Sequence, residues 1–168
     1  MKNNYLFSLL LLCNFVCFHG MANAVSEKKV STIFVENAYI RAKIPGTSIS
    51  SSYMVIENNG DSSVSLLSVS SNISPRIEIH QHTMLDGMMR MRKLDFIEVK
   101  AKERVKLQPS GLHLMLFDVK KSLNAQQHIE LTLKFSNNEL VTLQVPVYSP
   151  AQEKSANKTS DEMHTHHH

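Results

Sequence analysis

Short stretches of β-forming residues, separated by turn signals about every ten residues, run from Ile33 to Val147. Several of them alternate apolar and polar positions, which is the pattern of a strand with one buried face. Helical periodicity is nearly absent, with one helical turn expected at 122–127. The pattern predicts an all-β sandwich or barrel. The expected strands are 31–40, 51–57, 63–69, 77–82, 88–94, 96–99, 104–107, 112–117, 129–135 and 140–147.

A secretory signal peptide is predicted over residues 1–24. Lys2 supplies its positive charge, residues 6–18 its apolar stretch, and Ala22 and Ala24 its cleavage site. The apolar stretch is too short for a stable membrane span, and cleavage after Ala24 leaves a mature chain without one. The periplasm is the expected location.

The mature chain has no cysteine, because Cys13 and Cys17 both lie in the predicted signal peptide. Neither follows the small residue of a lipid-attachment box, since Leu12 and Val16 occupy those places. A chain without thiols excludes disulfide scaffolds, thiolate zinc sites, iron–sulfur clusters, cysteine nucleophiles and blue-copper carriers. The formal net charge is +3, or +2 without Lys2, which is too mild to indicate a nucleic-acid partner.

One folded domain is expected over residues 25–149. Residues 150–168 are polar and charged without apolar periodicity, so they predict a disordered tail. The tail ends in candidate ligands for Cu(II), Ni(II) or zinc, namely Met163, His164, His166, His167 and His168. An engineered tag is the alternative, although the run lacks six consecutive histidines.

His113 and Met115 are the first candidate ligands within the domain. They lie in the apolar run 112–117, which predicts a buried strand, and residues two apart on a strand project from the same face. Cu(I) prefers imidazole nitrogen and thioether sulfur, whereas zinc seldom uses a thioether. For each residue alone, a packed methionine or a surface histidine is the alternative interpretation.

A second imidazole and a second thioether come from two runs joined by Asp86-Gly87, a pair that predicts a tight turn. On the return run, Met89 and Met91 share a face. Alternation puts four side chains of the first run on one face: Glu78, His80, His82 and Met84.

The pairing of these two runs stays open. If Asp86-Gly87 is the centre of the loop, His82 lies opposite Met91; if Leu85-Asp86 is the centre, His80 does. Either register brings an imidazole beside a thioether, so the site does not depend on the choice.

Met84, Met88 and Met89 surround the same turn. They are either exposed or packing methionines, or a surface on which flexible thioethers guide a metal ion. No nucleophile elbow, phosphate-binding loop or zinc-protease motif is present, so we expect a binding protein and not an enzyme.

The order of the candidates, His80-x10-Met91-x21-His113-x-Met115, resembles the signature of the periplasmic copper chaperones called PCuAC. The resemblance covers roughly Ile33 to Val147. It extends to four further stretches, which are ENAYIR at 36–41, SYMVIEN at 52–58, DGMMRMR at 86–92 and PSGLHLML at 109–116.

The resemblance implies a cupredoxin-like or Ig-like Greek-key β-sandwich that binds Cu(I) through His80, Met91, His113 and Met115. It favours His80 over His82 as the ligand. It also implies delivery of copper toward the CuA site in subunit II of cytochrome c oxidase, directly or with Sco-type proteins, and Cu(II) binding by the tail.

The expected function is therefore that of a monomeric periplasmic Cu(I) chaperone. A copper-buffering protein that serves metal tolerance is the first rival. A β-sandwich interaction module with an incidental His/Met patch is the second, and a copper redox enzyme is the third.

Overall fold

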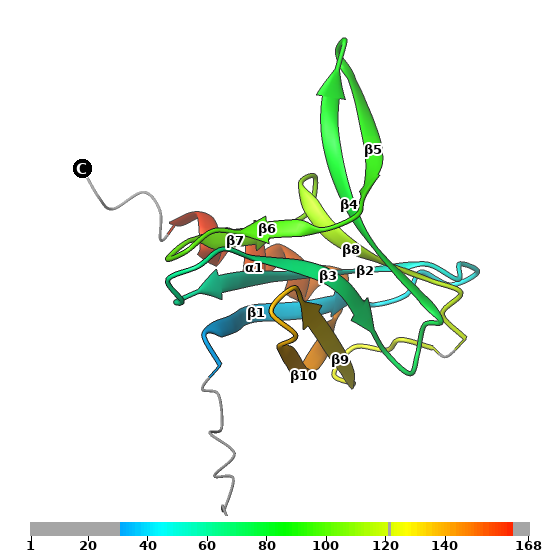
Figure 1. Cartoon of the computed structure of the whole chain (residues 1–168). Coiled ribbons are helices and arrows are strands. Elements are labelled where there is room, and N and C mark those ends of the chain that lie inside the picture. Colours follow the sequence, from blue (N-terminus) through cyan, green and yellow to red (C-terminus); the bar gives the residue numbers. More distant parts are fainter. Residues whose placement is uncertain (1–30, 121, 163–168) are drawn as a thin grey trace, which may run out of the picture.

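The computed structural model describes residues 31–120 and 122–162, and in these residues it contains ten strands and one helix (Figure 1). No helix in this part of the chain is long and apolar enough to cross a membrane. The elements are β1 (Ile33–Arg41), β2 (Ser50–Asn58), β3 (Val64–Ser70), β4 (Arg76–Leu85), β5 (Met88–Leu94), β6 (Ile97–Val99), β7 (Arg104–Leu107), β8 (Leu112–Phe117), β9 (His128–Phe135), β10 (Leu140–Tyr148) and α1 (Pro150–Glu162).

The strands form a β-sandwich, as expected. Their order is β5-β4-β8-β7-β2-β1-β10-β9-β3-β6, and β8 also pairs directly with β2. A short parallel pairing of β1 with β10, at Ile40–Val147 and Arg41–Tyr148, connects the strands of the two layers. The neighbours in each layer are otherwise mainly antiparallel.

The core lies between the layers and is built from alternate positions of the strands. Ile79 of β4 and Leu114 of β8 are paired, and they are exposed by only 5% and 0%. Burial of side chains of this size contributes about 1.5–3 kcal/mol each. Because side chains alternate along a strand, the neighbouring pair, His80 and His113, faces outward from the core.

All ten expected strands are present, with small differences at their ends. The largest difference between an expected and an observed strand is in β4, which continues to Leu85. The β4–β5 hairpin therefore extends beyond the rest of the molecule (Figure 1). The expected helical turn at 122–127 is wrong, since only a turn at Ala125 and Gln126 interrupts irregular chain there.

The prediction of disorder is wrong for Pro150–Glu162, which forms α1. Ser149 caps this helix: its backbone N–H donates to Gln152 Oε1 at 2.9 Å, and Pro150 follows at the first helical position. Glu153 is 8% exposed and accepts a hydrogen bond from Arg41 Nε at 2.8 Å. The cap and this ion pair hold a segment whose composition alone suggests a disordered chain. Residues 163–168, with the candidate tail ligands, lie outside the described residues.

Asn58, at the end of β2, connects the two layers. Its side chain is fully buried, and Nδ2 lies 2.9–3.1 Å from the carbonyl oxygens of Ser62, Val99 and Lys100. Its Oδ1 accepts from the backbone N–H of Gly60 at 2.9 Å. A Cβ at Gly60 would lie only 3.0 Å from that oxygen, so the close approach requires glycine.

Replacement of Asn58 by alanine is expected to lower the free energy of unfolding by about 1–3 kcal/mol, because buried backbone groups lose their partners. Urea denaturation of Asn58→Ala measures this loss. Asn59→Ala, at the exposed neighbouring position, is the control and should change stability by less than about 0.5 kcal/mol. Equal effects of the two substitutions would contradict the structural role of Asn58.

Candidate metal centre

The predicted ligands lie on the outer face of β4, β5 and β8. His80 pairs with His113 across β4 and β8, and Glu78 pairs with Met115 in the same register. His82 pairs with Met91 across β4 and β5. Directly paired residues project from the same face of a sheet, so the register brings all four predicted ligands, together with His82, onto one face.

The hairpin register is the one centred on Asp86-Gly87. Leu85 pairs with Met88, and the two loop residues have φ angles of 51° and 75°, as a tight two-residue turn requires. His82 therefore lies opposite Met91. The alternative register centred on Leu85-Asp86 is wrong, and His80 lies two pairs closer to the body of the sheet, opposite Lys93.

Three imidazole rings gather where β4 and β8 meet. The ring centroids of His82 and His113 are 5.0 Å apart, and those of His80 and His113 are 6.0 Å apart. The Tyr53 ring of β2 lies on another side of His113, at 6.4 Å. His113 is only 3% exposed although it faces away from the core.

Hydrogen bonds orient two of these rings. His113 Nδ1 lies 3.0 Å from the carbonyl oxygen of Gly111, so this nitrogen donates and Nε2 carries the lone pair in the neutral ring. His80 Nε2 lies 2.9 Å from Glu78 Oε2, so this nitrogen donates and Nδ1 carries the lone pair. Both neutral rings thus keep one nitrogen available as a ligand.

Two buried nitrogens on this face have no hydrogen-bond partner among the described residues, Nδ1 of His80 and Nδ1 of His82. An unpaired buried polar atom costs about 1–3 kcal/mol, and a bound metal ion would remove this cost. The donors present therefore suit a soft metal ion.

The two thioether residues are more accessible than His113. Met115 is half-buried between Glu78 of β4 and Ser51 of β2. Met91 is 45% exposed beside His82. No group of three or more His, Cys, Asp or Glu side chains in residues 31–120 and 122–162 is arranged to hold a metal ion. A site of the predicted composition therefore depends on sulfur as well as nitrogen.

The additional methionines divide between the two faces of the hairpin. Met84 and Met89 are paired and continue the outer row of His82 and Met91 toward the tip. Met88 pairs with Leu85 on the opposite face. All three are more than half exposed, and only Met84 and Met89 lie on the same face as the predicted ligands.

Glu78 is the most connected charged group at the site. Its carboxylate accepts from His80 Nε2, from Lys93 Nζ at 3.1 Å and from Arg76 at 3.0 Å, and these hydrogen bonds lower its pKa to about 2. Burial lowers the pKa of His113, although its hydrogen bond to Gly111 acts in the opposite direction. His113 therefore stays neutral, and able to bind a metal, at a lower pH than an exposed histidine.

From the sequence alone, neither Glu78 nor Tyr53 was assigned a role at this site. Glu78 is two residues from His80, and the alternation that put both on one face was the available signal. Tyr53 lies near His113 because β2 pairs with both β7 and β8, and no local sequence pattern reveals this pairing.

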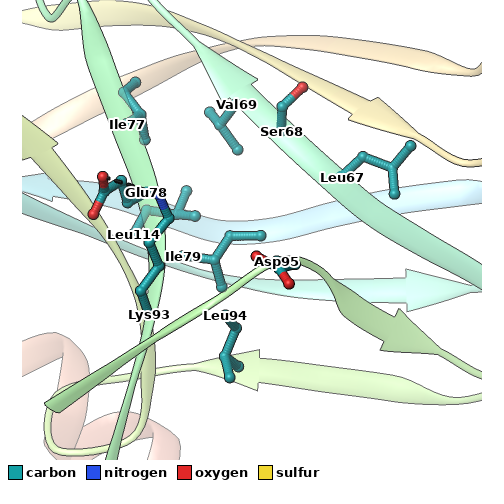
Figure 2. Close-up of a pocket in the computed structure, with 10 residues that line it drawn as sticks. All are labelled: Leu67, Ser68, Val69, Ile77, Glu78, Ile79, Lys93, Leu94, Asp95 and Leu114. Atoms are coloured by element: carbon teal, nitrogen blue, oxygen red, sulfur yellow. Dashed lines mark hydrogen bonds and ion pairs between the residues drawn. The ribbon is translucent and has the colours of Figure 1, made fainter.

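A separate pocket of about 280 Å³ lies on the core side of β4. Figure 2 shows that residues of β3, β4 and β5 surround it, with Ile77, Ile79 and Val69 among its apolar members. It contains none of the predicted ligands, although Glu78 and Lys93, which belong to the hydrogen-bond group around His80, also line it.

The lowered pKa of Glu78 predicts how stability changes in acid. Between its ordinary pKa of 4.5 and its folded pKa of about 2, the unfolded chain binds more protons, so stability falls as the pH drops through this window. Glu78→Gln should flatten this dependence in thermal unfolding between pH 5 and pH 2. Glu98→Gln, at an exposed position of β6, should keep the dependence of the unmodified protein. Parallel curves for the unmodified protein and Glu78→Gln would contradict the role of this carboxylate.

Known proteins resemble this chain over the same domain. Residues 33–147 match the family described as "Putative lipoprotein LpqE-like". "Putative lipoprotein Lxx21020" of Leifsonia xyli subsp. xyli is 26% identical over 71% of this chain and 72% of its own length. Protein RP573 of Rickettsia prowazekii is 32% identical over 58% of this chain and 55% of its own length.

Among solved structures, the copper-bound PCuAC domain from PmoF2 superposes with a TM-score of 0.62. It is 26% identical, and the match covers 71% of this chain and 95% of that domain. The fold and the family model agree with the resemblance found in the sequence. This chain belongs to the LpqE-like family, the family of PCuAC-type domains.

Proposed function

We propose that this protein is a periplasmic metallochaperone that binds Cu(I) through His80, Met91, His113 and Met115. The main support is the common face of β4, β5 and β8, on which two imidazoles and two thioethers lie together. The PmoF2 domain, which shares the fold, is copper-bound. Neutral nitrogen and sulfur donors suit Cu(I) better than zinc, which generally uses thiolate, imidazole or carboxylate ligands.

Copper release is proposed to begin at the exposed thioethers. Met91 is 45% exposed, so a partner's ligand can reach the ion from that side while His113 stays buried. Thiolates bind Cu(I) more strongly than thioethers, so ligand exchange would transfer the ion to a thiol site. By family resemblance, the acceptor is the CuA site of cytochrome c oxidase subunit II or a Sco-type protein. Neither step requires catalysis by this chain.

The location of this exchange is proposed to be outside the cytoplasm. The predicted signal peptide and the description of the family as lipoprotein-like support this. The tail ligands Met163, His164, His166, His167 and His168 are proposed to bind Cu(II) separately. A test of the tail should retain α1, because Glu153 of that helix pairs with Arg41.

The double substitution Met91→Leu/Met115→Leu is expected to weaken Cu(I) binding at least about a hundredfold, or about 2.7 kcal/mol, since both sulfur ligands are lost. Anaerobic titration of the full chain against a chromophoric Cu(I) chelator measures this. Met88→Leu, on the opposite face of the hairpin, is the matched control and should bind as the unmodified protein does. Undiminished binding by the double variant would refute the ligand assignment, and absence of Cu(I) binding by the unmodified protein would favour an interaction module.

Deletion of the gene distinguishes delivery from buffering. If the protein delivers copper, the deletion strain should lose copper from CuA and lose oxidase activity, and added copper should restore both. Sensitivity to copper should stay normal. Normal oxidase activity together with increased copper sensitivity would instead support the tolerance function.

A further inference from the structure

His82 differs from the other imidazoles, because the predicted Cu(I) ligand set does not use it. It lies between Met91, its partner across the hairpin, and His113, whose ring centroid is 5.0 Å away. This ring separation is shorter than the 6.0 Å between His80 and His113, two of the proposed ligands. The Nδ1 atom of His82 is buried and has no hydrogen-bond partner within residues 31–120 and 122–162. His82 therefore has the surroundings expected of a metal ligand, although the predicted Cu(I) site assigns it no role.

We propose that His82 is a third imidazole ligand and that the same face binds Cu(II) through His80, His82 and His113. This inference rests on the proposed function, in that the face is a copper site. Cu(II) is harder than Cu(I) and favours imidazole nitrogen over thioether sulfur. Two donor sets therefore share His80 and His113. Cu(I) adds Met91 and Met115 to this pair, whereas Cu(II) adds His82.

Two of the three ring separations, those of His80 and His82 from His113, are close to what imidazoles around one ion require. A metal–nitrogen distance of about 2.0 Å, with about 1.1 Å from the nitrogen to the ring centre, separates the centroids of neighbouring ligand rings by roughly 4.5–5.2 Å. The His82–His113 separation of 5.0 Å lies in this range, and the His80–His113 separation exceeds it by less than 1 Å. The three rings are not arranged to hold an ion in the present structure, so a small convergence must accompany binding.

The surrounding contacts favour such a convergence. The backbone N–H of His82 donates to the carbonyl oxygen of Gly111 at 3.2 Å, and His113 Nδ1 donates to the same oxygen at 3.0 Å. One backbone atom therefore holds both residues together while their rings can still turn about their side-chain bonds. The other donor of the set, His80, has its unpaired Nδ1 buried on the same face.

The test uses the full chain in which the tail histidines are replaced (His164→Asn, His166→Asn, His167→Asn and His168→Asn), so that Cu(II) bound by the tail does not interfere. In this background, His82→Gln is expected to weaken Cu(II) binding at least about tenfold more than it weakens Cu(I) binding. Competition titrations with glycine for Cu(II) and with a Cu(I) chelator measure the two affinities. Electron paramagnetic resonance should show the coordinated nitrogens falling from three to two.

His128→Gln, at an exposed position of β9, is the matched control and should change neither affinity nor spectrum. His82→Asn provides a second variant, and thermal unfolding verifies that each variant folds. If the unmodified protein binds no Cu(I), the proposed function itself fails. If Cu(I) binding is normal but His82→Gln leaves the Cu(II) affinity and nitrogen count unchanged, or weakens both ions equally, the inference about His82 is wrong.

Discussion

The arrangement of the metal-ligand candidates on the outer face of β4, β5 and β8 depends on a two-residue turn. Asp86 and Gly87 both adopt positive φ angles, and this turn sets how β4 pairs with β5. A turn centred one residue earlier would pair Met91 with His80 instead of His82, and a slip of the strand pairing by one residue would move Met91 to the face opposite the imidazoles. Glycine adopts such angles without steric cost and aspartate at a small one. A backbone constraint therefore determines which donors can meet.

The donors on this face divide into a fixed inner part and an accessible outer part. His113 is buried and hydrogen-bonded to Gly111, and His80 is held by Glu78, whose carboxylate also pairs with Lys93. Met91 lies on a hairpin that extends from the sandwich and carries no such restraint. Oriented imidazoles favour affinity, because little freedom is lost on binding, and exposed thioethers favour exchange.

Local patterns in the sequence were sufficient to predict where the strands lie and which residues share a face of β4 and of β8. Alternation of apolar and polar residues is a property of each strand alone. They were not sufficient for the hairpin register, since a turn centred on Leu85-Asp86 fits the same alternation. The approach of His82 to His113 arises from pairing of strands distant in sequence, which no local pattern encodes. The helix α1 was missed although its Ser149-Pro150 start was readable, because its stabilising partner Arg41 lies 112 residues from Glu153.

A chain of contacts runs from that helix to the buried, outward-facing His113. Arg41, paired with Glu153 of α1, lies 5.4 Å from the centre of the Tyr53 ring, and Tyr53 in turn contacts His113. The Tyr39 ring packs against Tyr53 at 5.0 Å, so aromatic side chains pack together beside His113. The lowered pKa of His113 is a consequence of this burial. The segment after the sandwich is therefore linked, through Arg41 and Tyr53, to an imidazole of the proposed metal site.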